Sequence, residues 1–324
     1  MENNSQTPLR LIWEPVENGA RLLRVYGMQN ILIVPDKIEG LPVTNIGAYC
    51  FADTERIPEK SEVRSTIIGE EASHLHPIAG KDLSQIILPD CVKCLEELSF
   101  YNCREMTMMQ LGKSTRDIGS DVFMNCRQLN TLQIRGDIRE RTGVKAVLSR
   151  IPWEIQVDFL EGEYASFLYP EYTDSYDEIA PAHIFGRNIT GEGFRARQLF
   201  SDGKVQIASY DGIFPKITAE ETALTAGKMA LLRLRYPIDL SIEAKTRYED
   251  KLCEVCGEIG IYYLEQRNLD MLKFLCEKKY LTGMALEHVI DAAVTANWSE
   301  GSASLMDWKF CFGKSRREDR YSFD

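Results

Sequence analysis

Residues Glu97–Leu129, ELSFYNCREMTMMQLGKSTRDIGSDVFMNCRQL, contain the same pattern twice. Phe100 stands two residues before an Asn-Cys pair, and 23 residues later Phe123 stands before a second such pair. The apolar segments LSQIILP (83–89), MTMMQLG (106–112) and LNTLQIR (129–135) also start 23 residues apart. Similar segments at one fixed spacing indicate an internal repeat.

Large apolar residues occupy positions one, four and six of all three segments: Leu83, Ile86 and Leu88; Met106, Met109 and Leu111; Leu129, Leu132 and Ile134. This spacing is the strand signature of a leucine-rich repeat, in which units stack because none buries its apolar edge alone. Each strand is followed by a second apolar pair that ends in the repeated phenylalanine, as in Leu95 and Phe100. We therefore predict a β-solenoid with one phenylalanine in the core of each coil. Free cysteine is among the most buried residue types, so Cys103 and Cys126 are predicted to be buried thiols.

The first unit has the same layout in Val34–Phe51, which reads V-P-x-x-I-x-G-x-P-V-T-x-I-G-x-x-x-F. On this block the chain resembles BspA-like leucine-rich repeat proteins, and the resemblance covers roughly residues 30–136. The positions that match the family pattern are Pro35, Pro89, Gly47, Gly119 and the three phenylalanines, whereas Cys50, Ser99 and Val122 replace its alanine. The resemblance implies a repeat fold. An adhesin role, which many secreted members have, does not carry over because we find no export signal.

Two flanking segments need a separate interpretation. Residues 9–27 hold two apolar runs joined through Asn18-Gly19, which predicts a β-hairpin with a type I′ turn that caps the solenoid. Residues 54–82 are longer than the later connections by about one repeat. They are either a degraded repeat, which we slightly favour, or a charged surface loop.

The period stops after Ile134, so we expect a leucine-rich-repeat domain at residues 1–150 that includes the hairpin cap. Residues 151–216 show no clean periodicity and are expected to form an irregular connector packed against both halves. From residue 217 the pattern turns helical, with a capping box at Thr218 and Glu221 and a stop at Pro237. The fold class is therefore α+β, a short β-solenoid followed by a connector and a helical domain at 217–324.

The helical domain is expected to contain several short helices. One stripe in residues 241–266 is predicted to face its core: Tyr248, Leu252, Val255, Ile259 and Tyr262. Shorter helices are expected at 269–279, 283–296 and about 301–312. The last helices are loosely similar to ankyrin-type helix pairs, although the T-P-L-H signature is absent.

Composition limits the partners that we expect. The chain has 324 residues, 44% hydrophobic and 27% charged, and no apolar run long enough to span a membrane. A net charge of −11 repels phosphate backbones, so we expect no nucleic-acid partner and no membrane partner. Nine cysteines, an odd number, argue against a disulfide framework. We expect a cytoplasmic protein.

The metal-ligating residue types do not form a convincing site. Cys91-Cys94 and Cys253-Cys256 are both C-x-x-C pairs, the usual material of a structural zinc site, but each falls inside an apolar pattern already explained. His74 and His76 would share one strand face without an evident third ligand, and His288 lies in a predicted helix. We expect no metal and no cofactor.

Polar and aromatic residues crowd into the stretch 169–197. The candidates there are Tyr172, Tyr176, Asp177, His183, Arg187, Arg195 and Arg197, with Tyr169 and Glu178 beside them. In an enzyme, Asp177 or Glu178 would orient His183 and the arginines would bind an anionic substrate, but no nucleophile motif accompanies them. The alternatives are a partner-binding patch, a small-molecule sensor, or a junction whose tyrosines and arginines bind one another.

The leading hypothesis places function on the repeat strands. Residues between the core positions of a leucine-rich repeat point out of the stack and form what we call the strand face: Ile31, Ile33, Gln85, Ile87, Met108, Gln110, Thr131 and Gln133. An apolar, amide-rich face with almost no charge suits recognition of a protein. We expect a non-catalytic protein–protein interaction module, unless the helical domain folds back over this face.

Overall fold

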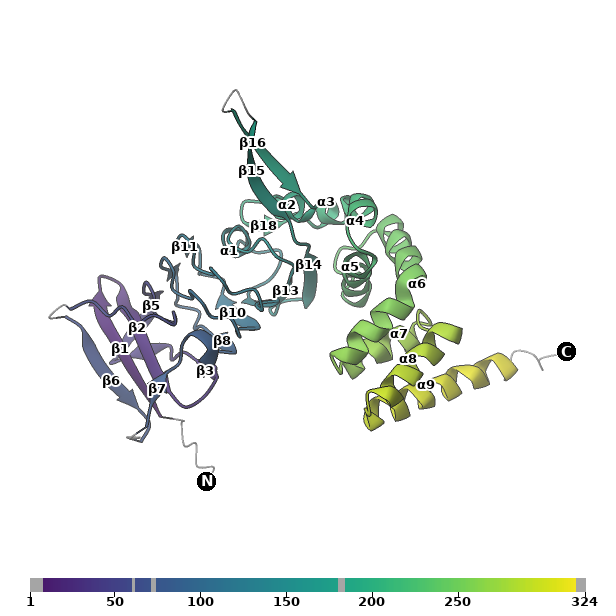
Figure 1. Ribbon diagram of the computed structural model, residues 1–324, viewed down its shortest axis with the longest axis horizontal. Coiled ribbons are helices and arrows are strands. Elements are labelled where there is room, and N and C mark those ends of the chain that lie inside the picture. The colour runs from purple at the N-terminus through teal and green to yellow at the C-terminus, as the bar shows by residue number, and fades with distance from the viewer. Residues whose placement is uncertain (1–7, 60–61, 71–73, 180–183, 319–324) are drawn as a thin grey trace. The chain divides into compact units, whose positions relative to one another are not determined.

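The computed structural model describes residues 8–59, 62–70, 74–179 and 184–318 (Figure 1). The chain is α+β and divides into two compact units, Met1–Tyr210 and Asp211–Asp324, here called the first and the second unit. The predicted division into residues 1–150, 151–216 and 217–324 stays a prediction.

The repeat strands of the first unit form a parallel sheet, as the period predicts. Its strands lie in the order β3 (Ile31–Ile33), β8 (Gln85–Ile87), β10 (Met108–Gly112), β12 (Thr131–Arg135) and β13 (Ile155–Phe159), and β14 (Ala165–Tyr169) closes the sheet antiparallel to β13. The apolar residues at positions one, four and six of the three segments are all buried, at most 2% exposed. The predicted solenoid core is confirmed.

The return segments of the coils form a second sheet on the other side of that core. Its main path runs β11 (Asp117–Ile118), β9 (Cys94–Leu95), β5 (Leu41–Ile46), β2 (Gly19–Gly27), β1 (Leu9–Val16) and β6 (Arg64–Ile68), with β4 (Lys37–Ile38) beside β5 and β7 (His76–Pro77) beside β2. The hairpin β1–β2 therefore continues the solenoid, because β2 pairs in parallel with the return strand β5. This pairing supports its predicted role as a cap.

The repeated corner is a column of identical contacts. Phe51, Phe100 and Phe123 are buried and stack in sequence, with ring centroids 5.1 and 5.9 Å apart, and we call them the corner column. The buried thiols follow the same step: Cys103 donates to the Phe51 carbonyl and Cys126 to the Phe100 carbonyl. The predicted column of buried cysteines is thus confirmed.

The asparagines of the repeated motif form a ladder along this corner. Asn125 Nδ2 donates to Asn102 Oδ1 at 2.7 Å, and Asn102 Nδ2 donates to Asp53 Oδ2 at 2.9 Å. Asn102 and Asn125 have φ angles of 62° and 66°, a left-handed conformation that asparagine tolerates better than most residues. The Asn-Cys pair is therefore repeated because the asparagine turns the chain while the cysteine fills the core.

The predicted type I′ turn in the N-terminal hairpin is wrong. Val16 pairs with Gly19, so the two loop residues are Glu17 and Asn18, and neither has a positive φ. A type I′ turn needs positive φ at both loop residues. The pairing register of the two strands also shifts between Ile12 and Trp13, which indicates a β-bulge. The register of this hairpin is therefore set by the bulge as well as by the turn.

Residues 54–82 are not a degraded repeat. The strands β3 and β8 on either side of this segment pair directly, Ile31 opposite Gln85 and Ile33 opposite Ile87, which leaves no place for another coil between them. Instead, β6 pairs antiparallel with β1 at the edge of the second sheet, and a short 3-10 helix (Gly80–Asp82) leads back into the stack. We call residues 54–82 the insertion.

The segment expected to be an irregular connector contains regular structure. Besides β13 and β14, the chain from residue 144 to 212 holds α1 (Val144–Leu148), β15 (Thr173–Ile179), β16 (Ile184–Thr190), α2 (Gly193–Ala196), β17 (Phe200–Ser201), β18 (Lys204–Val205) and α3 (Ile207–Gly212). β14 is buried along its whole length, so its sequence shows no alternation. For this reason periodicity did not reveal the strand.

The second unit consists of helices: α4 (Phe214–Glu220), α5 (Ala223–Arg235), α6 (Ile242–Glu265), α7 (Leu269–Glu277), α8 (Gly283–Thr295) and α9 (Ser299–Glu318). α6 contacts α5, α7 and α8, and it buries the predicted stripe except for Tyr262, which is half-buried. No helix in the described part of the chain is both long and apolar enough to cross a membrane.

The predicted helix start at Thr218 is wrong. Thr218 lies inside α4, where its hydroxyl donates to the Pro215 carbonyl. The next helix begins after Thr222, whose side chain accepts from the Thr225 amide and whose backbone is extended. Extended backbone is what an N-cap requires, whereas Pro215 at the first turn of α4 already favours a helix through Thr218.

Three successive helices of this unit end in the same local geometry. Arg267, Lys279 and Asn297 follow α6, α7 and α8 with φ angles of 50°, 62° and 52°. In each case the next amide bonds a carbonyl five residues back, as Asn268 does to Tyr263. This is the Schellman motif, which lets the chain reverse direction between helices.

Candidate functional site

The strand face is built from two rows of side chains in register. Ile31, Gln85, Met108 and Thr131 stand opposite one another on adjacent strands, and Ile33, Ile87, Gln110 and Gln133 form the second row. The structure therefore brings all eight predicted residues onto one surface. They lie on four neighbouring strands, and the buried core residues alternate with them.

Exposure changes along this surface. Ile31 and Ile33 at the β3 end are 48% and 64% exposed, while the six residues on β8, β10 and β12 are half-buried. Within the described residues, the side-chain amides of Gln85, Gln110 and Gln133 make no recorded hydrogen bond. These amides are not among the buried unpartnered groups, so their donors and acceptors are open to solvent.

The strand face continues onto β13, which sequence reasoning missed. Thr131 pairs with Gln156 and Gln133 with Asp158, so the two rows end in an amide and a carboxylate. These pairs are 25 residues apart instead of 23, and the period therefore fades after Ile134. The run Ile155–Phe159, with apolar residues at alternate positions, was the available signal.

Asp158 is a buried carboxyl at this end of the face. Its Oδ1 accepts from Gln156 Nε2 at 2.8 Å and from Ser166 Oγ at 2.6 Å. Burial raises the pKa of Asp158 above its usual range, and the hydrogen bonds from Ser166, Gln156 and Tyr164 oppose that rise only in part. Asp158 therefore takes up a proton more easily than an exposed aspartate.

The arginines of the 169–197 stretch bind groups of the protein itself. Arg187 makes two hydrogen bonds to Asp174, at 2.9 and 2.7 Å, which raise the pKa of Arg187 and lower that of Asp174. Arg195 pairs with Glu192 at 2.8 Å. These two contacts join arginines to acidic residues instead of tyrosines, and the alternative of a tyrosine–arginine junction stays a prediction.

Arg197 is the most deeply buried of these arginines. It donates to the carbonyls of Ile151, Trp153, Pro170 and Gly193 at distances of 2.5 to 3.0 Å. Burial lowers its pKa to about 10, while the nearby Tyr172 and Tyr169 raise it, and its guanidinium lies over both rings. It ties β14 and α2 to the segment before β13.

Of the other candidates in this stretch, Tyr172 contacts Arg197 and Tyr176 lies on the surface. Tyr176 is 66% exposed, and Tyr172 packs edge-on against Phe194. Asp177 belongs to β15, opposite Gly186. His183 lies outside the described residues, so the predicted His183–Asp177 pair stays a prediction.

The two C-x-x-C pairs belong to different units, Cys91-Cys94 to the first and Cys253-Cys256 to the second. Burial raises the pKa of all four thiols, and that of Cys94 to about 12, so they are protonated at neutral pH. In the described part of the chain, no three cysteine, histidine or acidic side chains gather as a metal site would require.

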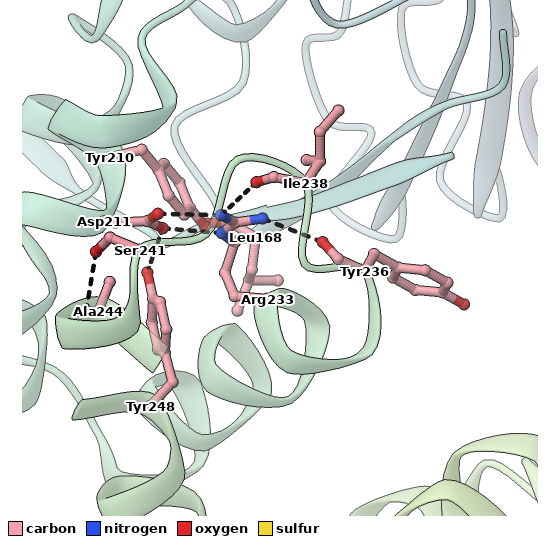
Figure 2. Close-up of polar contacts among 9 residues, drawn as sticks. All are labelled: Leu168, Tyr210, Asp211, Arg233, Tyr236, Ile238, Ser241, Ala244 and Tyr248. Carbon is pink, nitrogen blue, oxygen red and sulfur yellow. Dashed lines mark hydrogen bonds and ion pairs between the residues drawn. The ribbon is translucent and has the colours of Figure 1, made fainter. Parts of the chain in front are cut away.

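A buried ion pair holds the start of the second unit together (Figure 2). Arg233 is fully buried and makes two hydrogen bonds to Asp211, at 2.8 and 3.0 Å. Tyr248 donates to the same carboxylate at 2.8 Å, and Arg233 also donates to the carbonyls of Tyr236 and Ile238. Because every group has a partner, this cluster is structural; sequence reasoning predicted Tyr248 as core but did not find the ion pair.

Comparison with known proteins identifies the repeats. The sequence model of the family described as "BspA type Leucine rich repeat region (6 copies)" matches residues 78–142. Residues 78–142 match repeats of the BspA type. The match begins after the first coil and spans β8, β10 and β12 of the strand face, so the recognition made on the sequence is confirmed there.

Other comparisons add little to the BspA-type assignment. The crystal structure of the T. pallidum Leucine Rich Repeat protein (TpLRR) is similar over 37% of this chain and 67% of its own, with 15% identity and a TM-score of 0.22. No curated protein matches. The loose similarity of the second unit to ankyrin-type helix pairs stays a prediction.

Proposed function

We propose that this chain is a non-catalytic protein–protein interaction module that binds its partner on the strand face. The observation that carries this proposal is the register of the two rows, which places exposed isoleucines and half-buried, solvent-directed glutamine amides on one surface. Leucine-rich repeats commonly serve protein recognition, and the BspA-type match supports that use here.

The chemistry of the face suits a polypeptide partner. None of the eight residues is charged, so burying them does not require the desolvation of an ion. The glutamine amides can donate to and accept from a partner's backbone, and the isoleucines offer apolar area at the β3 end. The net charge of −11 disfavours nucleic acid, and we propose neither a nucleic-acid nor a membrane partner.

The alternative of a sensor or an enzyme at residues 169–197 has less support. Substrate binding by Arg187 or Arg197 would first have to break their hydrogen bonds to Asp174 or to backbone carbonyls. Breaking such charge-assisted bonds is costly, especially for buried Arg197. No observation favours this stretch over the strand face.

The test charges the middle of the face with Ile87→Glu and Met108→Glu. The matched control changes the same two residue types at exposed positions elsewhere in the unit, Ile67→Glu (45% exposed) and Met124→Glu (48% exposed). Proteins from a lysate of the native host are captured on immobilised protein, and circular dichroism checks folding. We expect the strand-face variant to lose a protein that the wild type and the control both retain.

Two outcomes would count against this proposal. If both folded variants capture the same proteins as the wild type, binding does not use this face. If the strand-face variant unfolds while the control folds, the face acts as core, and a weaker change such as Gln110→Ala must still reduce capture for the proposal to stand.

A further inference from the structure

A cavity of about 470 Å³ lies at the corner of the first unit where the insertion rejoins the repeats. None of its lining residues belongs to the strand face. It is lined by Arg24, Asp53, Pro77, Ala79, Lys81, Asp82, Asn102 and Arg104.

The insertion builds one wall of this cavity. Its last residues, Pro77–Asp82, run beside the corner of the first coil, where the Gly80 amide donates to the Phe51 carbonyl at 2.9 Å. Gly80 has a φ of +55°, and a Cβ on it would lie 2.8 Å from the Cβ of Asp53. The close approach therefore requires glycine, and it holds Lys81 and Asp82 against the repeats.

Three cations line the cavity in a chain whose net charge is −11. Arg24 is 2% exposed, and its Nη1 donates to the carbonyls of Tyr49, Cys50 and Ala52. These three bonds fix the guanidinium. Its buried Nε has no hydrogen-bond acceptor among the described residues, although the Glu55 carboxylate lies 3.8 Å away.

The acids at the cavity offset these charges only in part. Asp53 accepts from the Asn102 amide at 2.9 Å, and Asn102 is itself held by Asn125, so this carboxylate belongs to the asparagine ladder. Asp82 is exposed. Lys81 and Arg104, also exposed, form no recorded ion pair within the described part of the chain. The lining itself therefore carries one more positive than negative charge, which Glu55 beside Arg24 balances, and the buried Nε of Arg24 stays without a hydrogen-bond acceptor.

We propose that this cavity binds a small molecule that carries a phosphate or carboxylate group. Its volume lies in the range of about 300–1,000 Å³ that is typical of small-molecule sites. Only Pro77 and Ala79 are apolar in the lining, so an apolar ligand would gain little. Arg104 can donate two parallel bonds to one oxyanion, the unpartnered Nε of Arg24 can donate a third, and Lys81 adds a mobile positive charge.

The ligand is small and carries few negative charges. Asp82 and Glu55 would repel a second anionic group near the first, so a single phosphate or carboxylate on a hydroxylated carbon skeleton fits this lining best. The site does not depend on what binds the strand face.

The experiment is calorimetric titration of the full chain with inorganic phosphate, glucose 6-phosphate and lactate, each against sodium chloride at matched ionic strength. The test variant is Lys81→Ala with Arg104→Ala, two exposed residues whose loss leaves the core intact. The matched control is Lys93→Ala with Arg127→Ala, which removes the same charge from exposed positions of the same unit. We expect at least one oxyanion to bind, about tenfold or more weakly to the test variant, and unchanged to the control.

The pattern of binding decides the group that is recognised. Binding of both phosphates and not of lactate assigns a phosphate site, and the reverse assigns a carboxylate site. If no oxyanion gives heat beyond sodium chloride, or if the test variant and the control bind equally, the proposal is wrong. The strand-face variant Ile87→Glu with Met108→Glu is expected to keep this binding, so failure here is distinct from failure of the proposed function.

Discussion

The two units hold their chains together in opposite ways. In the first unit one contact recurs: the corner column Phe51, Phe100 and Phe123 stacks at intervals of 5.1 and 5.9 Å. In the second unit the fully buried Arg233 binds Asp211, which also accepts from Tyr248, and this cluster does not recur at a fixed spacing among the described residues. Its helix ends at Arg267, Lys279 and Asn297 are likewise local solutions at unequal intervals.

This difference determines how far the loss of one contact should destabilise the rest of each unit. In a repeat each coil contacts mainly its neighbours, so stability is approximately a sum of units and interfaces. Loss of a central contact therefore weakens the coils on both sides. A buried ion pair fails differently, because removal of one partner leaves an uncompensated charge in the core.

The largest effect is expected for Phe100→Ala in the middle of the corner column. Phe100 is completely buried between two stacked rings, so the change removes both stacking contacts and leaves a cavity. We expect a loss of about 3–5 kcal/mol in the free energy of unfolding of the first unit. Denaturant unfolding measures this loss, and hydrogen exchange shows whether the coils with Phe51 and Phe123 lose protection.

Met124→Ala is the control for this prediction, because Met124 is 48% exposed on the same corner. Its cost should stay within about 0.5 kcal/mol. If Phe100→Ala cost no more than the control, or if exchange increased in the second unit instead, the column would not be the support of the solenoid.

The sequence predicts the corner column but not the ion pair between Arg233 and Asp211. The reason is physical. A solenoid repeats its core contacts at a constant interval, so Phe100 and Phe123 reveal one another. Arg233 and Asp211 are 22 residues apart in a stretch without a period, and charged residues are normally expected on the surface. Only the folded chain shows that they meet.

The same reasoning explains the strand face and its missing end. The alternation of core and outward residues predicted that eight side chains share one surface, and the strand register agrees. Their role in binding stays a proposal. Gln156 and Asp158 were missed because their spacing from β12 is 25 residues. The cavity could not be predicted at all, since it depends on how residues 77–82 of an aperiodic insertion lie on the corner.

The next effect in size is expected for Asp211→Asn in the second unit. The change keeps the shape and an acceptor for Tyr248 but leaves the buried guanidinium of Arg233 without its counter-charge. We expect a loss of about 3 kcal/mol in the stability of this unit, measured by denaturant unfolding with hydrogen exchange of its peptides.

Asp250→Asn provides the same chemical change at an exposed position of α6 and should cost almost nothing. An equal cost for both variants would mean that the Asp211–Arg233 pair adds no stability beyond a surface charge. Loss of protection in the first unit after Asp211→Asn would contradict the view that the cluster acts within the second unit alone.

The smallest effect is expected for Asp158→Asn at the end of the strand face, and it depends on pH. The pKa of Asp158 is raised in the folded chain by burial, so as the pH falls the folded state takes up this proton before the unfolded state does. The wild type must then gain stability relative to the asparagine variant between neutral pH and about pH 4, because the variant has no such proton to bind.

At neutral pH the variant should be at least as stable, since its amide oxygen can still accept from Gln156 and Ser166 without a buried charge. Urea unfolding at several pH values measures this change in the stability difference, with Asp121→Asn as an exposed control. A difference that stays constant with pH would show that the hydrogen bonds of Asp158 cancel the effect of its burial, and a change in the opposite direction would show that they outweigh it.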